Sequence, residues 1–391
     1  MMLLLTVACA SDPKEVEEDP LPKEPSVLKI YVFAPDKPIV TRADIGDVDA
    51  SADEAAINTL DVWVFNHDNL AERVGHVHLA NMTWEGQKEI SIELSDDMGE
   101  KVALGMTVDV YVVANATTAN CGLTLNAETT VTQLNDALIQ HNSADYFGLT
   151  SPVTSVPVEG LPMSGVLKEQ VINGESPVFR VVNSVGGLAT VRLVRAVSKV
   201  RFIFSQSVSN VPAISDLSIS LAEGVLPTQE YLFLDPDLPS KKSHVGASYE
   251  SAADLVTGIT SEDIAKSIDP VQYVYDKDAS ESGQAYENRI NEGLKSEVDD
   301  EGTVTKSAEL SELGRFYLRE SDKQLTGTIN YKLGGVSKGP KTFTMDMAGD
   351  FTRNHTWIVY GYFLGSGDLV LHAVDVKAWT LEEDEHDIYN W

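Results

Sequence analysis

The sequence predicts an all-β protein made of two tandem β-sandwich domains with few short helices. Three observations support this: many short runs of β-branched and aromatic residues, turn residues between them, and little helical periodicity. The chain has 391 residues, enough for two or three domains, and its hydrophobic content of 43% is sufficient for two substantial cores.

The first predicted strand is residues 27–33, which alternate in the manner of a half-buried strand. Leu28, Ile30 and Val32 should point one way, and Lys29 and Tyr31 the other. An acidic stretch over residues 11–20 precedes this strand and reads as a flexible tether. The strand is followed by Arg42, the first arginine of the chain.

Further strands are predicted throughout the chain. They cover residues 60–65, 90–94, 108–115, 178–182, 189–194, 200–204, 217–221, 316–318, 325–331, 341–345, 357–363 and 369–379. Two short helices are expected, one over residues 132–139 with Thr132 as its N-cap and one over residues 261–266. The polar segment 276–306 reads as a long surface loop. A boundary near residues 194–197 divides the chain into units 43–195 and 196–391.

The net charge of −31 argues against nucleic acid and anionic lipid as partners. Cys9 follows a short apolar stretch that ends in Val7-Ala8, which is typical of a bacterial lipoprotein signal over residues 1–9. The leader lacks a positive n-region and is short, which a start codon assigned too late would explain. If Cys9 carries lipid, Cys121 has no partner for a disulfide bond in the chain and is expected to be an inert thiol.

No metal, cofactor or catalytic site is predicted. His76 and His78 should face the same side of a strand, but two ligands are too few for zinc, so they read as surface histidines. An acidic group resembles a calcium loop only loosely, because Ala52 and Asn58 occupy the positions of the turn glycine and the bidentate acid. We expect this group to be a solvated loop; its members are Asp44, Asp47, Asp49, Asp53 and Glu54.

Several segments follow one another along the chain in a characteristic order: Cys9, the strand before Arg42, residues 60–65, 110–115, 161–165 and 195–200, Arg353-Asn354-His355 before Trp357, and Val376-Lys377-Ala378-Trp379. Through the order of these segments the chain resembles the fimbrillin family, the two-domain pilus subunits of Bacteroidales. The resemblance implies two transthyretin-like sandwiches and export as an outer-membrane lipoprotein. It also implies removal of the leading strand by an arginine-specific protease and polymerisation by strand insertion into a fimbrium on the cell surface.

Applied to this chain, the resemblance implies cleavage after Arg42. The cut would remove the tether and leading strand, residues 10–42, and Ala43 would become the N-terminus of the mature chain. Leu28, Ile30 and Val32 would fill a groove until that cleavage. A donor strand is expected near the C-terminus. Residues 381–391 are too acidic to fill an apolar groove well, so the candidate donor residues are Leu369, Leu371, Val374 and Val376. The expected partners are other fimbrial subunits and the protease, with host-surface proteins or glycans as further candidates.

Two alternatives remain open. The chain could be a lipid-anchored lipoprotein that binds carbohydrate, with its five tryptophans contributing to a sugar-binding face. It could also be a fimbrial tip or anchor subunit that does not propagate the fibre. A hydrolase has no support, because the sequence contains neither a nucleophile elbow nor a phosphate-binding loop.

Overall fold

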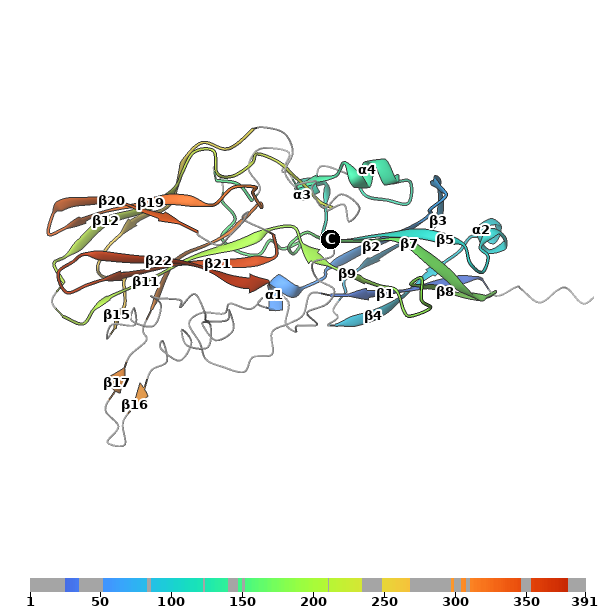
Figure 1. The fold of residues 1–391 in the computed structure, drawn as a ribbon, viewed down its shortest axis with the longest axis horizontal. Coiled ribbons are helices and arrows are strands. Elements are labelled where there is room, and N and C mark those ends of the chain that lie inside the picture. Colours follow the sequence, from blue (N-terminus) through green and yellow to red (C-terminus); the bar gives the residue numbers. More distant parts are fainter. Residues whose placement is uncertain are drawn as a thin grey trace, which may run out of the picture.

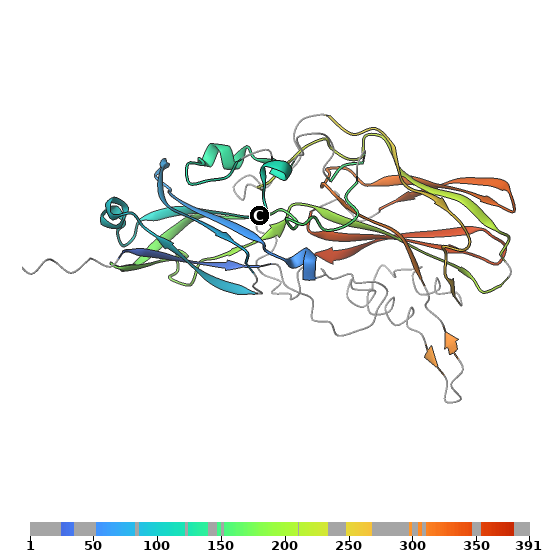
Figure 2. The same cartoon turned by 180° about the vertical axis from the view of Figure 1, so that it is seen from behind.

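The computed structural model describes residues 25–34, 52–82, 86–121, 124–139, 147–149, 152–209, 211–233, 248–267, 297–298, 304–306, 310–345 and 353–378. Strands dominate these residues, which confirms the all-β class. The molecule is elongated, with strands of the first half of the chain at one end and strands of the second half at the other (Figure 1). The view from behind shows the same two groups joined near α1 (Ala52–Ala55) (Figure 2).

The first group is a single sheet of nine strands. They are β1 (Val27–Phe33), β2 (Thr59–Asn66), β3 (Asn69–Ala80), β4 (Gln87–Glu93), β5 (Thr107–Ala114), β7 (Met163–Glu175), β8 (Val178–Val182), β9 (Thr190–Arg192) and β10 (Val194–Arg195). The order is β3-β2-β5-β7-β8-β1-β4, with β9 paired to β1 and β10 to β7. The sheet curves so that its two end strands, β3 and β4, come close to each other. Their proximity is seen at Gly75 of β3, where an added Cβ would lie 2.8 Å from Ile92 Cγ2 of β4. The inward side chains fill one hydrophobic cluster.

The second group consists of two sheets packed face to face. One contains β11 (Ser198–Ser207), β15 (Lys266–Ser267), β18 (Ser311–Leu318), β21 (His355–Phe363) and β22 (Leu369–Ala378). The other contains β12 (Ile214–Leu221), β14 (Ala253–Ile259), β19 (Thr326–Leu333) and β20 (Val336–Thr344). Phe202 of β11 meets Phe343 of β20 edge to face at 5.9 Å between ring centres, so the core lies between the sheets.

A third hydrophobic cluster joins the two groups. It combines Trp63 and Tyr111 of the first sheet with Leu232, Phe233 and Tyr317 from later in the chain. β13 (Glu230–Tyr231) also pairs with β6 (Leu138–Ile139), so backbone hydrogen bonds cross the same junction. The division into units 43–195 and 196–391 therefore stays a prediction, although β10 ends at Arg195 where we expected the boundary.

The predicted strands are present, but two long ones, β3 and β7, were missed. Of the segment 276–306, the described part is a small ladder of β16 (Glu297–Val298) and β17 (Val304–Lys306).

Both helix predictions need correction. The first helix is α4 (Val131–Asn135), and its N-cap is Thr130 rather than Thr132, because Thr130 and Gln133 form a capping box. The segment predicted as the second helix is a turn that leads into β15. Besides α1 and α4, the helices in the described part are α2 (Asp96–Lys101) and α3 (Thr118–Cys121). None of the helices that the structure describes is long and apolar enough to cross a membrane.

Candidate functional site: the strand that completes the first sheet

β1 lies inside the first sheet and has neighbours on both sides. It pairs antiparallel with β4 from Val27 to Phe33, and parallel with β8 and then β9 on the other side. Among the described strands, β4 pairs only with β1. Within the part of the chain that the structure describes, β1 is therefore the only strand that attaches β4 to the rest of the sheet by backbone hydrogen bonds.

The inward side of β1 is fully buried. Leu28, Ile30 and Val32 are 0% exposed and belong to the hydrophobic cluster of the first sheet, as the alternation of the sequence predicts. Burying three aliphatic side chains of this size contributes roughly 5–9 kcal/mol, as an upper estimate that omits the cost of ordering the strand. Removal of β1 would expose an apolar groove.

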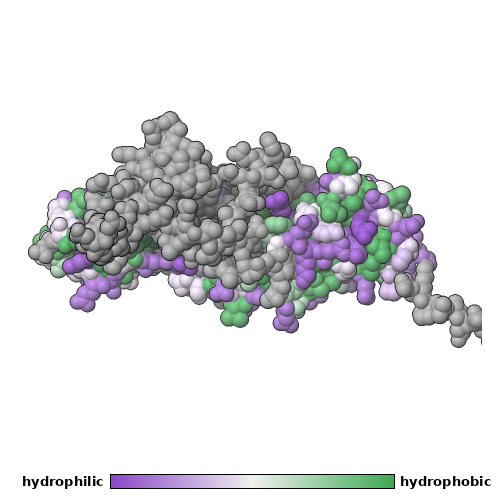
Figure 3. Space-filling model, turned by 90° about the horizontal axis from the view of Figure 1, so that it is seen from below, coloured by the Kyte–Doolittle hydropathy of each residue, from purple (hydrophilic) through white to green (hydrophobic). Residues whose placement is uncertain are grey.

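The outward side of β1 is polar and centres on Glu89 of β4. Lys29 Nζ lies 2.6 Å from Glu89 Oε1, and the Tyr31 hydroxyl donates to Glu89 Oε2 at 2.6 Å. These two hydrogen bonds lower the pKa of the Glu89 carboxyl, the one from Lys29 contributing most. The bond to Glu89 likewise raises the pKa of Tyr31. Seen from below, the surface over the first sheet is largely hydrophilic, with apolar residues interspersed (Figure 3).

A second outward contact passes over β1 without involving it. Gln87 of β4 donates from Nε2 to Thr190 Oγ1 of β9 at 2.9 Å, although β1 lies between these two strands. At the same end, the Arg192 guanidinium lies 5.4 Å from the centre of the Phe33 ring. β1 is thus held from the solvent side as well as from the core.

α1 is the first described element after β1, and its residue Glu54 is completely buried. Its carboxylate accepts a bond from Lys199 Nζ at 3.0 Å and another from the Tyr317 hydroxyl, and its backbone oxygen accepts from Arg195 Nε at 2.8 Å. Burial lowers the pKa of Lys199 to about 8, although Glu54 opposes this shift. The prediction of a solvated loop is wrong for Glu54, because strands from the second half of the chain enclose its side chain.

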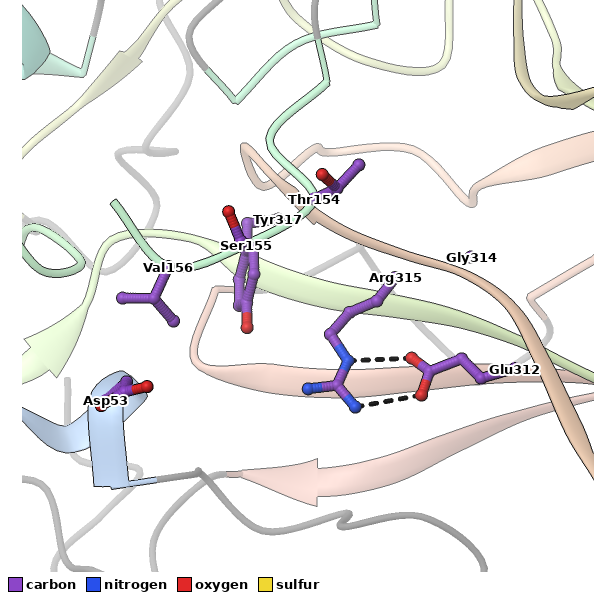
Figure 4. Close-up of a pocket in the computed structure, with 8 residues that line it drawn as sticks. All are labelled: Asp53, Thr154, Ser155, Val156, Glu312, Gly314, Arg315 and Tyr317. Carbon is purple, nitrogen blue, oxygen red and sulfur yellow. Dashed lines mark hydrogen bonds and ion pairs between the residues drawn. The ribbon is translucent and has the colours of Figure 1, made fainter. Parts of the chain in front are cut away.

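A polar cavity of about 480 Å³ lies beside this buried pair (Figure 4). It is lined by Asp53, Thr154, Ser155, Val156, Glu312, Gly314, Arg315 and Tyr317. Arg315 binds both oxygens of Glu312 at 2.8 and 3.0 Å, and Arg201 binds the same oxygens at 3.1 and 2.8 Å. Burial disfavours the ionised carboxylate, but the bonds from Arg315 and Arg201 outweigh it and lower the pKa of Glu312 to about 2.

Several predicted site residues lie outside the described residues: Cys9, Arg42, Ala43, Asp44, Asp47 and Asp49. The candidate donor strand is β22, which lies at the edge of its sheet and, among the described strands, pairs with β21 alone. Leu369 is buried in its own core, and Leu371 is partly buried against it. The side chains of Val374 and Val376 lie outside the described part.

The two predicted histidines do face the same side. His76 Nε2 and His78 Nδ1 lie 3.0 and 2.9 Å from the two oxygens of Asp61, and Trp63 stacks on His76 at 5.1 Å between ring centres. Only His78 is well exposed, so the description as surface histidines is wrong for His76. Cys121 is buried and donates to the Thr117 carbonyl oxygen.

Sequence reasoning missed Glu89, Gln87 and Thr190. The alternation of residues 87–93 marks Glu89 as outward-facing, but its partners are about 60 residues away in the chain, and only the strand pairing identifies them. The buried pair of Glu54 and Lys199 was missed for the same reason.

Residues 27–186, from β1 to the turn after β8, match the family model described as "Major fimbrial subunit protein (FimA)". This match confirms the resemblance to the fimbrillin family over that part of the chain. The matched family is one of structural fimbrial subunits rather than enzymes. The match supports a structural or adhesive role in a cell-surface fimbria, together with other fimbrial subunits.

Several solved bacterial structures match most of this chain at low sequence identity. A putative cell adhesion protein from Parabacteroides distasonis is 15% identical with a TM-score of 0.49, over 91% of this chain and 97% of that one. A fimbrilin from Porphyromonas gingivalis is 10% identical with a TM-score of 0.46, over 92% and 99%. The tip fimbrial protein Mfa3 of the same organism, with C-terminal truncation, is 11% identical with a TM-score of 0.46, over 89% and 99%. No curated protein matches the chain significantly.

Proposed function

We propose that this protein is a structural subunit of a fimbria whose assembly begins when β1 is removed. It is exported as a lipoprotein acylated at Cys9, cut after Arg42 by an arginine-specific protease, and polymerised when a strand from another subunit enters the vacated position. Host-surface proteins or glycans would then be contacted by the assembled fibre.

The observation that carries this proposal is the position of β1 between β4 and the pair β8–β9. A strand at the edge of a sheet could leave without opening a groove, but β1 exposes an unpaired edge on each side when it leaves. Three apolar sites, those of Leu28, Ile30 and Val32, open at the same time. Such a slot favours insertion of a strand from another chain, because the new strand restores both ladders and the core.

Glu54 explains how the mature chain could keep its front end in place after the cut. It lies 12 residues beyond Arg42, and its bonds to Lys199 and Tyr317 do not involve β1. Loss of residues 1–42 would leave this attachment intact. β22 is the candidate donor because, as an edge strand, it has a single ladder to break in the described part of the chain.

The test is N-terminal sequencing of subunits from surface fibres, combined with substitutions at the cleavage site. Wild-type subunits should begin at Ala43. Arg42→Ala and Arg42→Lys should both block cleavage and fibre formation, because an arginine-specific protease accepts neither residue. Lys37→Ala, a change of a basic residue in the same segment, is the matched control and should assemble normally. Normal fibres of uncut Arg42→Ala subunits would refute the proposal.

A further inference from the structure

The groove that β1 occupies is polar along its outer rim, and the two sides of that rim carry opposite charges. Glu89 lies on the β4 side, while Arg180 of β8 and Arg192 of β9 lie on the other. Lys29 and Tyr31 of β1 both turn to the acidic side and bind the same carboxylate at 2.6 Å. β1 is therefore matched to the groove by charge as well as by its apolar face.

Removal of β1 would leave Glu89 without either of these hydrogen-bond donors. A replacement strand that brings a lysine and a second donor to the same two outward positions would restore them, whereas a strand with an acidic residue there would be repelled. The required pattern, in the direction of β1, is aliphatic, lysine, aliphatic, and then an aromatic residue that can donate a hydrogen bond.

This pattern recurs near the end of the chain. Val376-Lys377-Ala378-Trp379 repeats Leu28-Lys29-Ile30-Tyr31 in order and direction, and the indole N–H of tryptophan is a donor like the tyrosine hydroxyl. The acidic run of residues 382–385 would instead place carboxylates beside Glu89. The backbone at Val376–Ala378 forms the last part of β22, where the register with β21 shifts, so this part can separate without disrupting the whole strand.

From these observations we propose that Glu89 is the residue that selects the incoming strand, and that its preferred occupant is the segment beginning at Val376 of a second copy of this chain. The inference rests on the proposed function. Ala378 is smaller than Ile30, and Thr380, the next inward residue, brings a hydroxyl to the position of Val32. The second copy therefore fits the groove less tightly than β1 does, and exchange follows only after β1 has been cut free.

The experiment uses the full chain with residues 37–42 replaced by the recognition sequence of a site-specific protease. After cutting, fluorescently labelled peptides compete for the groove, and their affinities are measured by anisotropy. The peptide VKAWTL, which corresponds to residues 376–381, should bind at least about fivefold more tightly than the same peptide with Lys377→Glu and Trp379→Phe.

Variants of Glu89 separate selection from simple apolar binding. Glu89→Gln should abolish most of the preference, and Glu89→Lys should reverse it in favour of the glutamate peptide. Glu93→Gln, an exposed acidic residue on the same strand and face, is the matched control and should keep the wild-type preference. Equal binding of both peptides by the wild type, or an unchanged preference in Glu89→Lys, overturns the inference and leaves the proposed function standing. If even the β1 peptide VLKIYV fails to bind the cut protein, the proposed function fails as well.

Discussion

Gln87 of β4 and Thr190 of β9 form a 2.9 Å hydrogen bond across the outer side of β1, which lies between their two strands. A strand that leaves toward solvent has to break this bond first. The contact therefore links the retention of β1 to two residues that remain in the protein after cleavage.

Gln87→Ala should speed the release of β1 from the cut subunit. One exposed hydrogen bond contributes about 1 kcal/mol, so release should be roughly fivefold faster. The rate is measured as loss of the labelled 1–42 fragment from the cut protein. Gln170→Ala is the control, because Gln170 bonds to Lys168 of its own strand, and its release rate should equal that of the wild type. Equal rates for both variants would show that the contact does not retain β1.

Ile30→Ala should destabilise the uncut subunit by about 2–5 kcal/mol, because it leaves a cavity at a fully buried position. The value is measured by urea unfolding. The matched change on the outward face, Lys29→Ala, should cost no more than about 1 kcal/mol. Fibres assembled from Ile30→Ala subunits should be as stable as wild-type fibres, since the altered strand is no longer part of them. Weakened mature fibres would mean that β1 is retained.

The buried pair of Glu54 and Lys199 should be far more sensitive to substitution than its surroundings. Glu54→Ala leaves the lysine buried without its carboxylate, which should cost about 3–5 kcal/mol. Asp53→Ala, an exposed change next to it on α1, should cost less than about 1 kcal/mol. The double variant Glu54→Ala/Lys199→Ala should lose less than the sum of the two single variants, as measured by thermal unfolding. Strict additivity would contradict a direct coupling.

The lowered pKa of the Glu312 carboxyl should make the stability of the folded protein depend on pH. Its pKa is about 2 in the folded protein and lies at the ordinary 4.5 in the unfolded chain. Above about pH 4.5 the carboxylate is charged in both states, and its bonds to Arg201 and Arg315 stabilise the fold by up to about 3 kcal/mol. This contribution is lost as the pH falls from 4.5 toward 2, because the unfolded chain takes up the proton first.

The check compares urea unfolding of wild-type protein and Glu312→Gln at several pH values. The difference in stability should be largest near pH 6 and should shrink steadily below pH 4.5. Glu262→Gln, which changes an exposed carboxylate in a turn, is the control and should show a small difference at every pH. A difference for Glu312→Gln that does not depend on pH would contradict the assignment.

The fold was predictable from sequence where one side of a strand is regularly apolar. β1 alternates regularly, and β5 is apolar at every position except Thr107 and Asp109, so the sequence predicts both. β3 and β7 were missed because polar residues in succession break the period of two, Glu72-Arg73 in β3 and Lys168-Glu169-Gln170 in β7, and both strands contain glycine. The sequence predicts Thr132 as the cap of the helix, but the reciprocal bonds between Thr130 and Gln133 place the start of the helix at Val131.

The inward residues of the candidate site were also predictable, since alternation alone places Leu28, Ile30 and Val32 on one side. Their neighbours were not, because β4, β8 and β9 come from distant parts of the chain and the parallel pairing with β8 and β9 leaves no local signal. The same limit applies to Glu54, whose burial depends on strands about 145 and 263 residues away. Regular alternation also places positions 369 and 371 on the opposite face from positions 374 and 376, so one donor strand could use only one of these pairs.

The most direct test of the central claim is a reversible lock on β1. Lys29 and Ser91 stand directly opposite each other on β1 and β4, so Lys29→Cys/Ser91→Cys should form a disulfide that holds β1 after the chain has been cut. A second disulfide, Thr59→Cys/Ala80→Cys, joins β2 to β3 in the same sheet and serves as the control. Filament formation by the cut subunit is followed by electron microscopy before and after reduction. The account predicts no filaments from the oxidised β1–β4 subunit, filaments once it is reduced, and filaments from the control in both states. Filaments that grow from the oxidised β1–β4 subunit would contradict it.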